Sequence, residues 1–114
     1  MTGLNISATG FLTAARRLEV NANNIANLAT PGFQASRADS VELKGGGTAI
    51  GSITTDPTPP LPGVQGEFGF PGGSNVNLAV EITNTIVNRN AFQANINAFR
   101  AQADLIGELL DLTR

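Results

Sequence analysis

Apolar residues near the start of the chain recur at alternating steps of four and three positions. This spacing is a heptad pattern, which aligns side chains in one stripe along an α-helix. The helix is predicted to end at Thr30-Pro31-Gly32, because the residue before proline disfavours helical geometry and glycine allows the chain to reverse. The predicted stripe consists of Leu4, Ala8, Phe11, Ala15, Leu18, Ala22, Ile25 and Ala29.

A second, longer helix is predicted from about residue 74 onward. It begins with three candidate capping residues, Ser74, Asn75 and Asn77. The four-and-three alternation returns here, and it passes through Thr85 and Arg89. The apolar members of this stripe are Leu78, Ile82, Phe92, Ile96, Phe99, Ala103, Ile106 and Leu110.

The C-terminal helix carries another apolar stripe beside the first. One partner helix covers only one stripe, so we expect the other to contact neighbouring subunits. Alanine predominates in this second stripe, which suits close packing between helices. Its members are Val87, Ala91, Ala94, Ala98, Ala101 and Leu105, followed by Leu109 and Leu112.

The end of the first helix is rich in asparagine and carries no charge between Glu19 and Arg37. Asparagine is a poor helix former, because its short amide competes for nearby backbone groups. Two interpretations are open. The amides face water in a low-charge hairpin, or other copies surround the helices and uncharged amides avoid repulsion. In the second case Asn23, Asn24 and Asn27 meet the next subunit or the chain leaving the Pro31-Gly32 turn.

The middle of the chain, residues 33–73, is rich in glycine and proline, which interrupt helices and shorten strands. Residues 40–43 and 49–54 are candidates for short extended segments, so we expect loops with a small β-hairpin as the ordered element. The three glycines at 45–47 predict a flexible turn. The fold class is therefore mainly α, with two long terminal helices paired as an antiparallel coiled-coil hairpin. Its predicted parts are residues 1–32, 33–73 and 74–114.

Composition excludes several classes of function. The 114 residues suffice for one domain at most, and a net charge of -2 gives no basic surface for nucleic acid. No run of about 18 apolar residues is present, so direct membrane insertion is not expected. Residues 1–10 lack the basic and apolar regions of a cleaved secretory signal. If the protein leaves the cytoplasm, we expect it to do so without such a leader.

Chemistry at a catalytic or metal site is also not expected. The chain has no cysteine and no histidine, which removes thiol nucleophiles, zinc sites and imidazole bases. Asp104, Glu108 and Asp111 share one helix face, but no partner group accompanies them, and a solvated face is the better interpretation. We therefore predict no enzyme activity, no cofactor and no metal.

Both ends of the chain carry a recognisable sequence pattern, ISATGFLTAARRLEVNANNIANLATPGFQASR near the start and SNVNLAVEITNTIVNRNAFQANINAFRAQADLIGELLDL near the end. The first resembles the N-terminal signature of the bacterial flagellar basal-body rod and hook family, and the second resembles the C-terminal segment of the same family. The chain departs from the pattern at Asn77, where the family commonly has Asp, and at Arg89 to Phe92. The matching signature residues are Asn24, Asn27, Thr30, Pro31, Gly32 and Phe33.

The resemblance implies a structural subunit of the periplasm-spanning rod. Such subunits pair their terminal helices as a coiled coil and pack helically into a tube that transmits torque and encloses the export channel. The implied partners are other copies, other rod or hook subunits, and the flagellar type III export apparatus. The short middle segment favours the proximal-rod type. The alternatives are a hook-type or other axial subunit, or a helical adaptor for export that does not polymerise.

Overall fold

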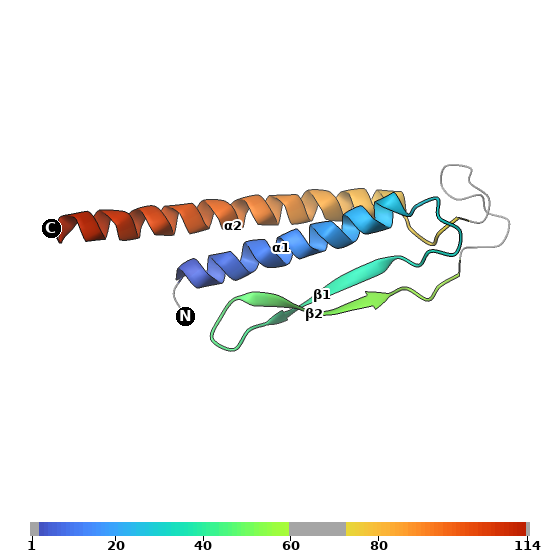
Figure 1. Ribbon diagram of the computed structural model, residues 1–114, viewed down its shortest axis with the longest axis horizontal. Coiled ribbons are helices and arrows are strands. Elements are labelled where there is room, and N and C mark those ends of the chain that lie inside the picture. The colour runs from blue at the N-terminus through green and yellow to red at the C-terminus, as the bar shows by residue number, and fades with distance from the viewer. Residues whose placement is uncertain (1–2, 60–72, 114) are drawn as a thin grey trace.

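The computed structural model describes residues 3–59 and 73–113 and is mainly helical (Figure 1). Helix α1 spans Gly3–Ala26 and helix α2 spans Leu78–Leu112. Between them lie the strands β1, Ser36–Glu42, and β2, Thr48–Thr55, which pair as a two-stranded antiparallel sheet. The small β-hairpin expected in the middle segment is therefore present, with longer strands than the sequence indicates.

The two helices lie side by side and run in opposite directions, with the hairpin on the other side of α1 (Figure 1). Helix α1 is thus the central element, and it packs against α2 as well as both strands. The molecule is elongated, with principal extents of 71 × 26 × 15 Å. Within the described residues, Ala14 and Val76 are the only buried apolar side chains, so the apolar core is thin.

Local chemistry explains where the elements begin and end. Helix α2 starts after Asn77, whose side chain accepts a hydrogen bond from the backbone N–H of Val80 at 3.2 Å, as an N-cap does. Helix α1 ends at Ala26, earlier than Ala29, and Gly32 then adopts a φ of 74° in the turn. The predicted turn therefore begins within the asparagine-rich segment.

The end of the glycine turn lies against α1. The backbone N–H of Thr48 donates to Thr9 Oγ1 at 3.3 Å, and Thr13 Oγ1 donates to the Thr48 carbonyl at 3.0 Å. At Gly47 a Cβ atom would lie 2.5 Å from Thr9 Oγ1, so only glycine permits this approach. The hydroxyls of α1 therefore fix the tip of the hairpin.

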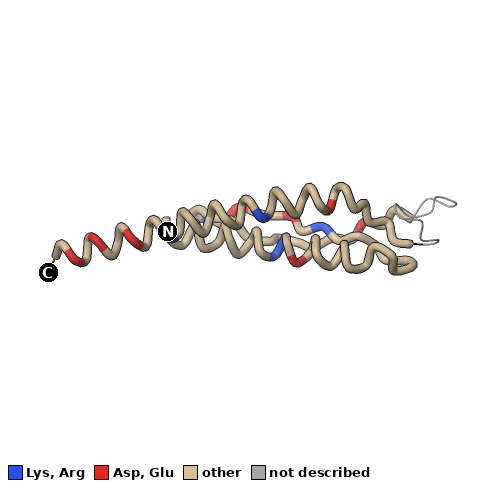
Figure 2. Tube along the Cα trace, turned by 90° about the horizontal axis from the view of Figure 1, so that it is seen from above, with Lys and Arg blue, Asp and Glu red and all other residues tan. Residues whose placement is uncertain are grey.

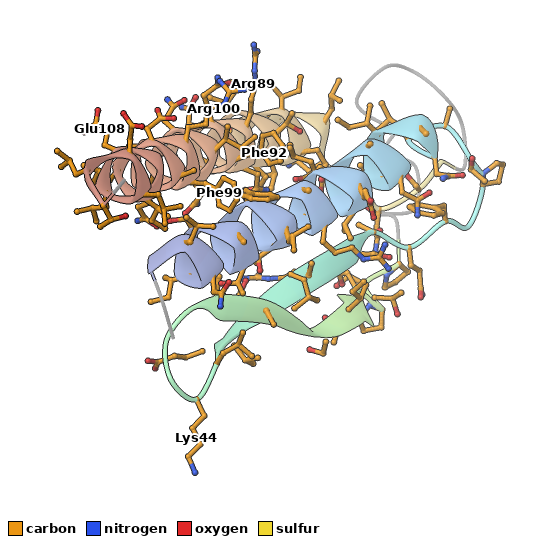
Figure 3. The ribbon with its side chains drawn as sticks, turned by 60° about the vertical axis from the view of Figure 1, so that its left-hand side comes forward. Lys44, Arg89, Phe92, Phe99, Arg100 and Glu108 are labelled. Carbon is orange, nitrogen blue, oxygen red and sulfur yellow. The ribbon has the colours of Figure 1, made fainter. Side chains whose placement is uncertain are left out.

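Three phenylalanines form the centre of the contact between the helices. Phe11 meets Phe92 and Phe99 edge to face, with ring centroids 6.1 and 5.8 Å apart. Both rings of α2 point toward α1 (Figure 3). Along α2, four polar residues also lie toward α1 and recur every seven positions. They are Glu81, Asn88, Asn95 and Gln102, of which Glu81 and Asn88 are buried and the other two half-buried.

These polar positions correct part of the predicted apolar stripes. Three polar residues lie in the contact where the stripe predicts the next residue along the chain. They are Asn21, Glu81 and Gln102, and the predicted neighbours Ala22, Ile82 and Ala103 are exposed. For Asn21 and Glu81 the reason is a hydrogen bond across the contact, which a search for apolar periodicity does not detect. Gln102 lies against Gly3 with its Oε1 buried and without a hydrogen bond among the described residues. Ile106 and Leu110 are exposed because they lie beyond the start of α1, and Ala29 because it follows its end. The exposed members of the predicted stripes are Ala22, Ala29, Ile82, Ala103, Ile106 and Leu110.

The remaining members of the two stripes are half-buried in this single chain. They are Leu4, Ala8, Phe11, Ala15, Leu18, Ile25, Leu78, Phe92, Ile96 and Phe99.

We predict opposite effects of alanine at two helical glycines. A Cβ atom at Gly10 would lie 2.4 Å from Asn95 Oδ1, whereas nothing lies within 4 Å of one at Gly107. Gly10→Ala is expected to lower the free energy of unfolding by about 1–3 kcal/mol through overpacking. Gly107→Ala is expected to raise it by up to about 1 kcal/mol, because alanine favours the helix. Urea unfolding measures both, and an equal gain at the two positions would contradict the close approach at Gly10.

Candidate functional site

The residues with the most specific contacts lie where the end of α1, the base of the hairpin and the start of α2 meet. We call this region the asparagine junction, and it contains Asn21, Asn24, Asn27 and Asn75. It joins segments that are far apart in the sequence. Its hydrogen bonds therefore determine how the two helices and the hairpin are placed relative to one another.

Asn21 connects the two helices through a buried chain of polar groups. Its Nδ2 donates to Glu81 Oε2 at 2.7 Å, and its Oδ1 accepts from Asn88 Nδ2 at 2.9 Å. All three residues are buried. A hydrogen bond to a carboxylate is stronger than one between neutral groups, and a buried carboxylate is costly without one. Asn21 therefore satisfies Glu81 inside the helix pair.

Asn24 has the largest fully buried side chain of the described residues, with an exposed fraction of 0%. Its Oδ1 accepts from the backbone N–H of Ser36 and its Nδ2 donates to the Ser36 carbonyl, both at 2.8 Å. The amide thus pairs with the first residue of β1 as another strand would. The prediction that Asn24 faces a neighbouring subunit is wrong. It meets instead the chain that leaves the Pro31-Gly32 turn.

Asn23 and Asn27 stabilise the end of α1. Asn27 Nδ2 donates to the carbonyl and to Oδ1 of Asn23 at 2.9 and 3.0 Å, and its Oδ1 accepts from Thr30 Oγ1 at 3.1 Å. These bonds join the last turn of the helix to the first residues that follow it. Asn27 is half-buried, whereas Asn23 is exposed and accessible to another molecule. In the signature turn Thr30, Pro31 and Gly32 are exposed and Phe33 is half-buried.

Asn75 holds both ends of the hairpin, a role that its position among candidate helix caps does not reveal. Its Oδ1 accepts from the Ala35 N–H at 2.7 Å, and its Nδ2 donates to the carbonyls of Asp56 and Thr58 at 2.9 and 2.7 Å. The preceding Ser74 Oγ donates to the Leu28 carbonyl at 2.7 Å. Hydrogen bonds from the Thr58 hydroxyl and backbone N–H hold the pKa of the Asp56 carboxyl below its ordinary value.

The candidate interface residues of α2 are solvent-exposed in this chain. Val87 and Leu105 are 58% and 59% exposed. Past Gln102, which lies against Gly3 at the start of α1, helix α2 continues beyond the described part of α1 (Figure 1). We call residues 103–112 the tail, and its large apolar side chains are exposed. The exposed stripe consists of Val87, Ala91, Ala94, Ala98, Ala101 and Leu105.

Two family models match the chain, one at each end. The model for flagella basal body rod protein matches residues 4–34, and the model for flagellar basal body rod FlgEFG protein C-terminal matches residues 69–112. Together they cover about two thirds of the 114 residues. This chain belongs to the flagellar basal-body rod protein family. The family is structural and not enzymatic. Among curated proteins, no match is found.

The two matched segments of this rod-family chain meet in the asparagine junction. Asn21 and Asn24 lie in the first segment, and Asn75 and Glu81 in the second. Among residues 3–59 and 73–113 no group of three His, Cys, Asp or Glu side chains is placed to hold a metal ion. In the same part of the chain, neither helix has the length and apolar character needed to cross a bilayer.

We predict that Asn24→Ala destabilises this rod-family protein far more than Asn23→Ala. The first change leaves the N–H and carbonyl of Ser36 without partners, at a cost of about 1–3 kcal/mol for each buried group. The second removes an exposed side chain and should change stability by less than about 0.5 kcal/mol. Thermal unfolding followed by circular dichroism measures the difference, and equal losses would contradict the pairing with Ser36.

We also predict that Asn24→Asp makes stability depend on pH. The introduced carboxyl would be buried opposite the Ser36 carbonyl oxygen, which favours its protonated form and raises its pKa in the folded state. Because that pKa exceeds the unfolded value, stability is retained at low pH and lost as pH rises through the folded pKa. Unfolding of the variant and of the unchanged protein across the acidic to neutral range tests this. A difference between them that is independent of pH would contradict it.

Proposed function

We propose that this protein is a structural subunit of the flagellar rod and polymerises helically into the tube that transmits torque and encloses the export channel. In this proposal residues 1–32 and 74–114 form the axial core as an antiparallel coiled coil, and residues 33–73 lie between them. Its partners are other copies, other rod or hook subunits, and the flagellar type III export apparatus. Its place is the rod that spans the periplasm.

The observation that carries the proposal is the large apolar surface that one chain leaves uncovered. Leu105, Leu109 and Leu112 of the tail are 59%, 63% and 82% exposed. Folded monomers rarely expose a continuous apolar surface of this kind, and such surfaces mark contacts with other proteins. The family match supports neighbouring rod subunits as the molecules that cover it.

The size of the middle segment supports the proximal-rod type of subunit. Between α1 and α2 the described residues form one short hairpin that packs on α1, and the whole connection has only about 50 residues. A connection of this length leaves no room for an additional outer domain between the two helices. A hook-type subunit and an export adaptor that does not polymerise are the competing functions, and the experiment below separates the adaptor from an axial subunit.

We predict that Ala94→Glu or Ala98→Glu blocks incorporation into the rod while leaving expression of the folded protein intact. Both alanines are exposed in the single chain, so a charge there is tolerated until a neighbour packs on it. Gln93→Glu is the matched control, because it adds the same charge at the adjacent exposed position with almost no change in shape. Motility and the protein content of isolated hook-basal bodies are measured.

Loss of motility and of incorporation with the alanine variants, but not with Gln93→Glu, is the expected result. Normal motility in strains with either alanine variant would overturn the interface assignment. Absence of the unchanged protein from purified hook-basal bodies would favour the adaptor over an axial subunit.

A further inference from the structure

A groove runs along α1 between α2 and β1. Two adjoining hollows of about 460 and 390 Å³ form it, and Arg17 and Asn88 line both. In the smaller hollow the surface is made largely by small residues, including Gly10, Ala14 and Ala91. The larger hollow adds Val80 and Val87 of α2 and residues 35–39 beside or within β1. One wall of the groove therefore continues the exposed stripe of α2.

Arg17 is the cation of the groove that has no partner within the described residues. Its side chain is half-buried, its Nε is inaccessible to solvent, and that atom has no hydrogen bond. Arg17 is the one charged residue among those that line the smaller hollow, whereas the larger hollow also holds Arg37, Asp39, Asp56 and Glu81. Asp39 pairs with Arg37 at 3.3 Å, Glu81 accepts from Asn21, and Asp56 accepts from Thr58. A carboxylate from another molecule that enters the smaller hollow would therefore meet the positive charge of Arg17 with no acidic lining residue beside it.

The tail has the complementary character. Asp104, Glu108 and Asp111 recur at steps of four and three, so they share one face of the helix. Leu105, Leu109 and Leu112 each follow one of these acids and form the adjacent face. No lysine or arginine lies between 101 and 112, and Figure 2 shows the acidic side of this end of the molecule. Beside the predicted stripe residues Ala103, Ile106 and Leu110, the tail therefore presents a row of leucines next to a row of carboxylates.

We propose that the tail of one copy lies in the groove of a second copy. The leucine face would cover the small residues Gly10, Ala14 and Ala91, and the acidic face would place a carboxylate at Arg17. The tail's ten residues measure about 15 Å as a helix, and the wall of the groove from Val80 to Asn95 about 22 Å, so the lengths are compatible.

The contact has to form between two copies. The groove wall and the tail belong to the same continuous helix, α2, so the tail cannot fold back into its own groove. A contact between two different surfaces of identical chains is head to tail, and it builds open helical assemblies when the rotation does not close. This inference rests on the proposed polymerisation and specifies which surfaces meet.

Disulfide cross-linking between two singly substituted chains tests the contact. The chain has no cysteine, so every disulfide reports an introduced pair. An Ala91→Cys chain is mixed with a Leu109→Cys chain under conditions that allow assembly, and the mixed disulfide is quantified. Lys44→Cys replaces Ala91→Cys in the control mixture, because Lys44 is exposed and points away from the body at the hairpin tip (Figure 3). Strong cross-linking with Ala91→Cys and little with Lys44→Cys is expected.

Charge reversal tests the pairing with Arg17. Adding Arg17→Glu to the Ala91→Cys chain should abolish the cross-link, and adding Asp104→Arg and Glu108→Arg to the Leu109→Cys chain should also abolish it. Combining both changes should restore it. Arg16→Glu is the matched control, since Arg16 pairs with Glu19 and does not line the groove. The tail variants change only exposed side chains, so they test the pairing even if Arg17→Glu unfolds its chain.

Two outcomes would overturn the inference. One is a cross-link no stronger than that of the Lys44→Cys control. The other is a cross-link that survives reversal of the tail charges. If the protein is nevertheless found in isolated hook-basal bodies, the proposed function stands and only the docking of the tail is wrong. If the cross-link forms as expected but the protein is absent from those bodies, copies associate in this way without the protein being a rod subunit.

Discussion

The structure depends on amide side chains that take the place of missing backbone partners at the asparagine junction. Asn24 pairs with both backbone groups of Ser36, and Asn75 holds backbone groups on both sides of the hairpin. Backbone groups that leave a helix or enter a strand need partners when they are buried. Because an amide both donates and accepts, asparagine meets this need without bringing a charge into the interior. The asparagines make the segment a poor helix former, but the fold depends on their hydrogen bonds.

The thin apolar core gives these polar contacts unusual weight. Ala14 and Val76 are the only buried apolar side chains among the described residues. The three phenylalanines between the helices, Phe11, Phe92 and Phe99, are only half-buried. A chain of this size can bury only a limited share of its apolar surface by itself. The side chains that one copy leaves exposed on α2 and in the tail are consistent with a subunit whose remaining burial comes from its neighbours.

Sequence periodicity predicted the helices well and their contact surface only in part. Phe11, Phe92 and Phe99 meet as the heptad pattern predicts. Another part of the contact lies one residue away from the apolar pattern, at Asn21 instead of Ala22 and at Glu81 instead of Ile82. Periodicity identifies apolar stripes, but it gives no weight to polar residues that satisfy one another across a contact. The hydrogen bonds of Asn75 were unpredictable for a related reason, since they join segments distant in sequence.

The sequence by itself determined the two long helices, the interrupted middle with its hairpin, the absence of thiol and imidazole chemistry, and the resemblance to the rod family. These follow from local properties, namely side-chain periodicity, the geometry of proline and glycine, and residue types in a motif. Only the tertiary structure decided which asparagine bonds which group, that α1 lies between α2 and the hairpin, and that a groove with Arg17 opens beside it. Those features depend on distances between residues far apart in the chain, and no local pattern contains them.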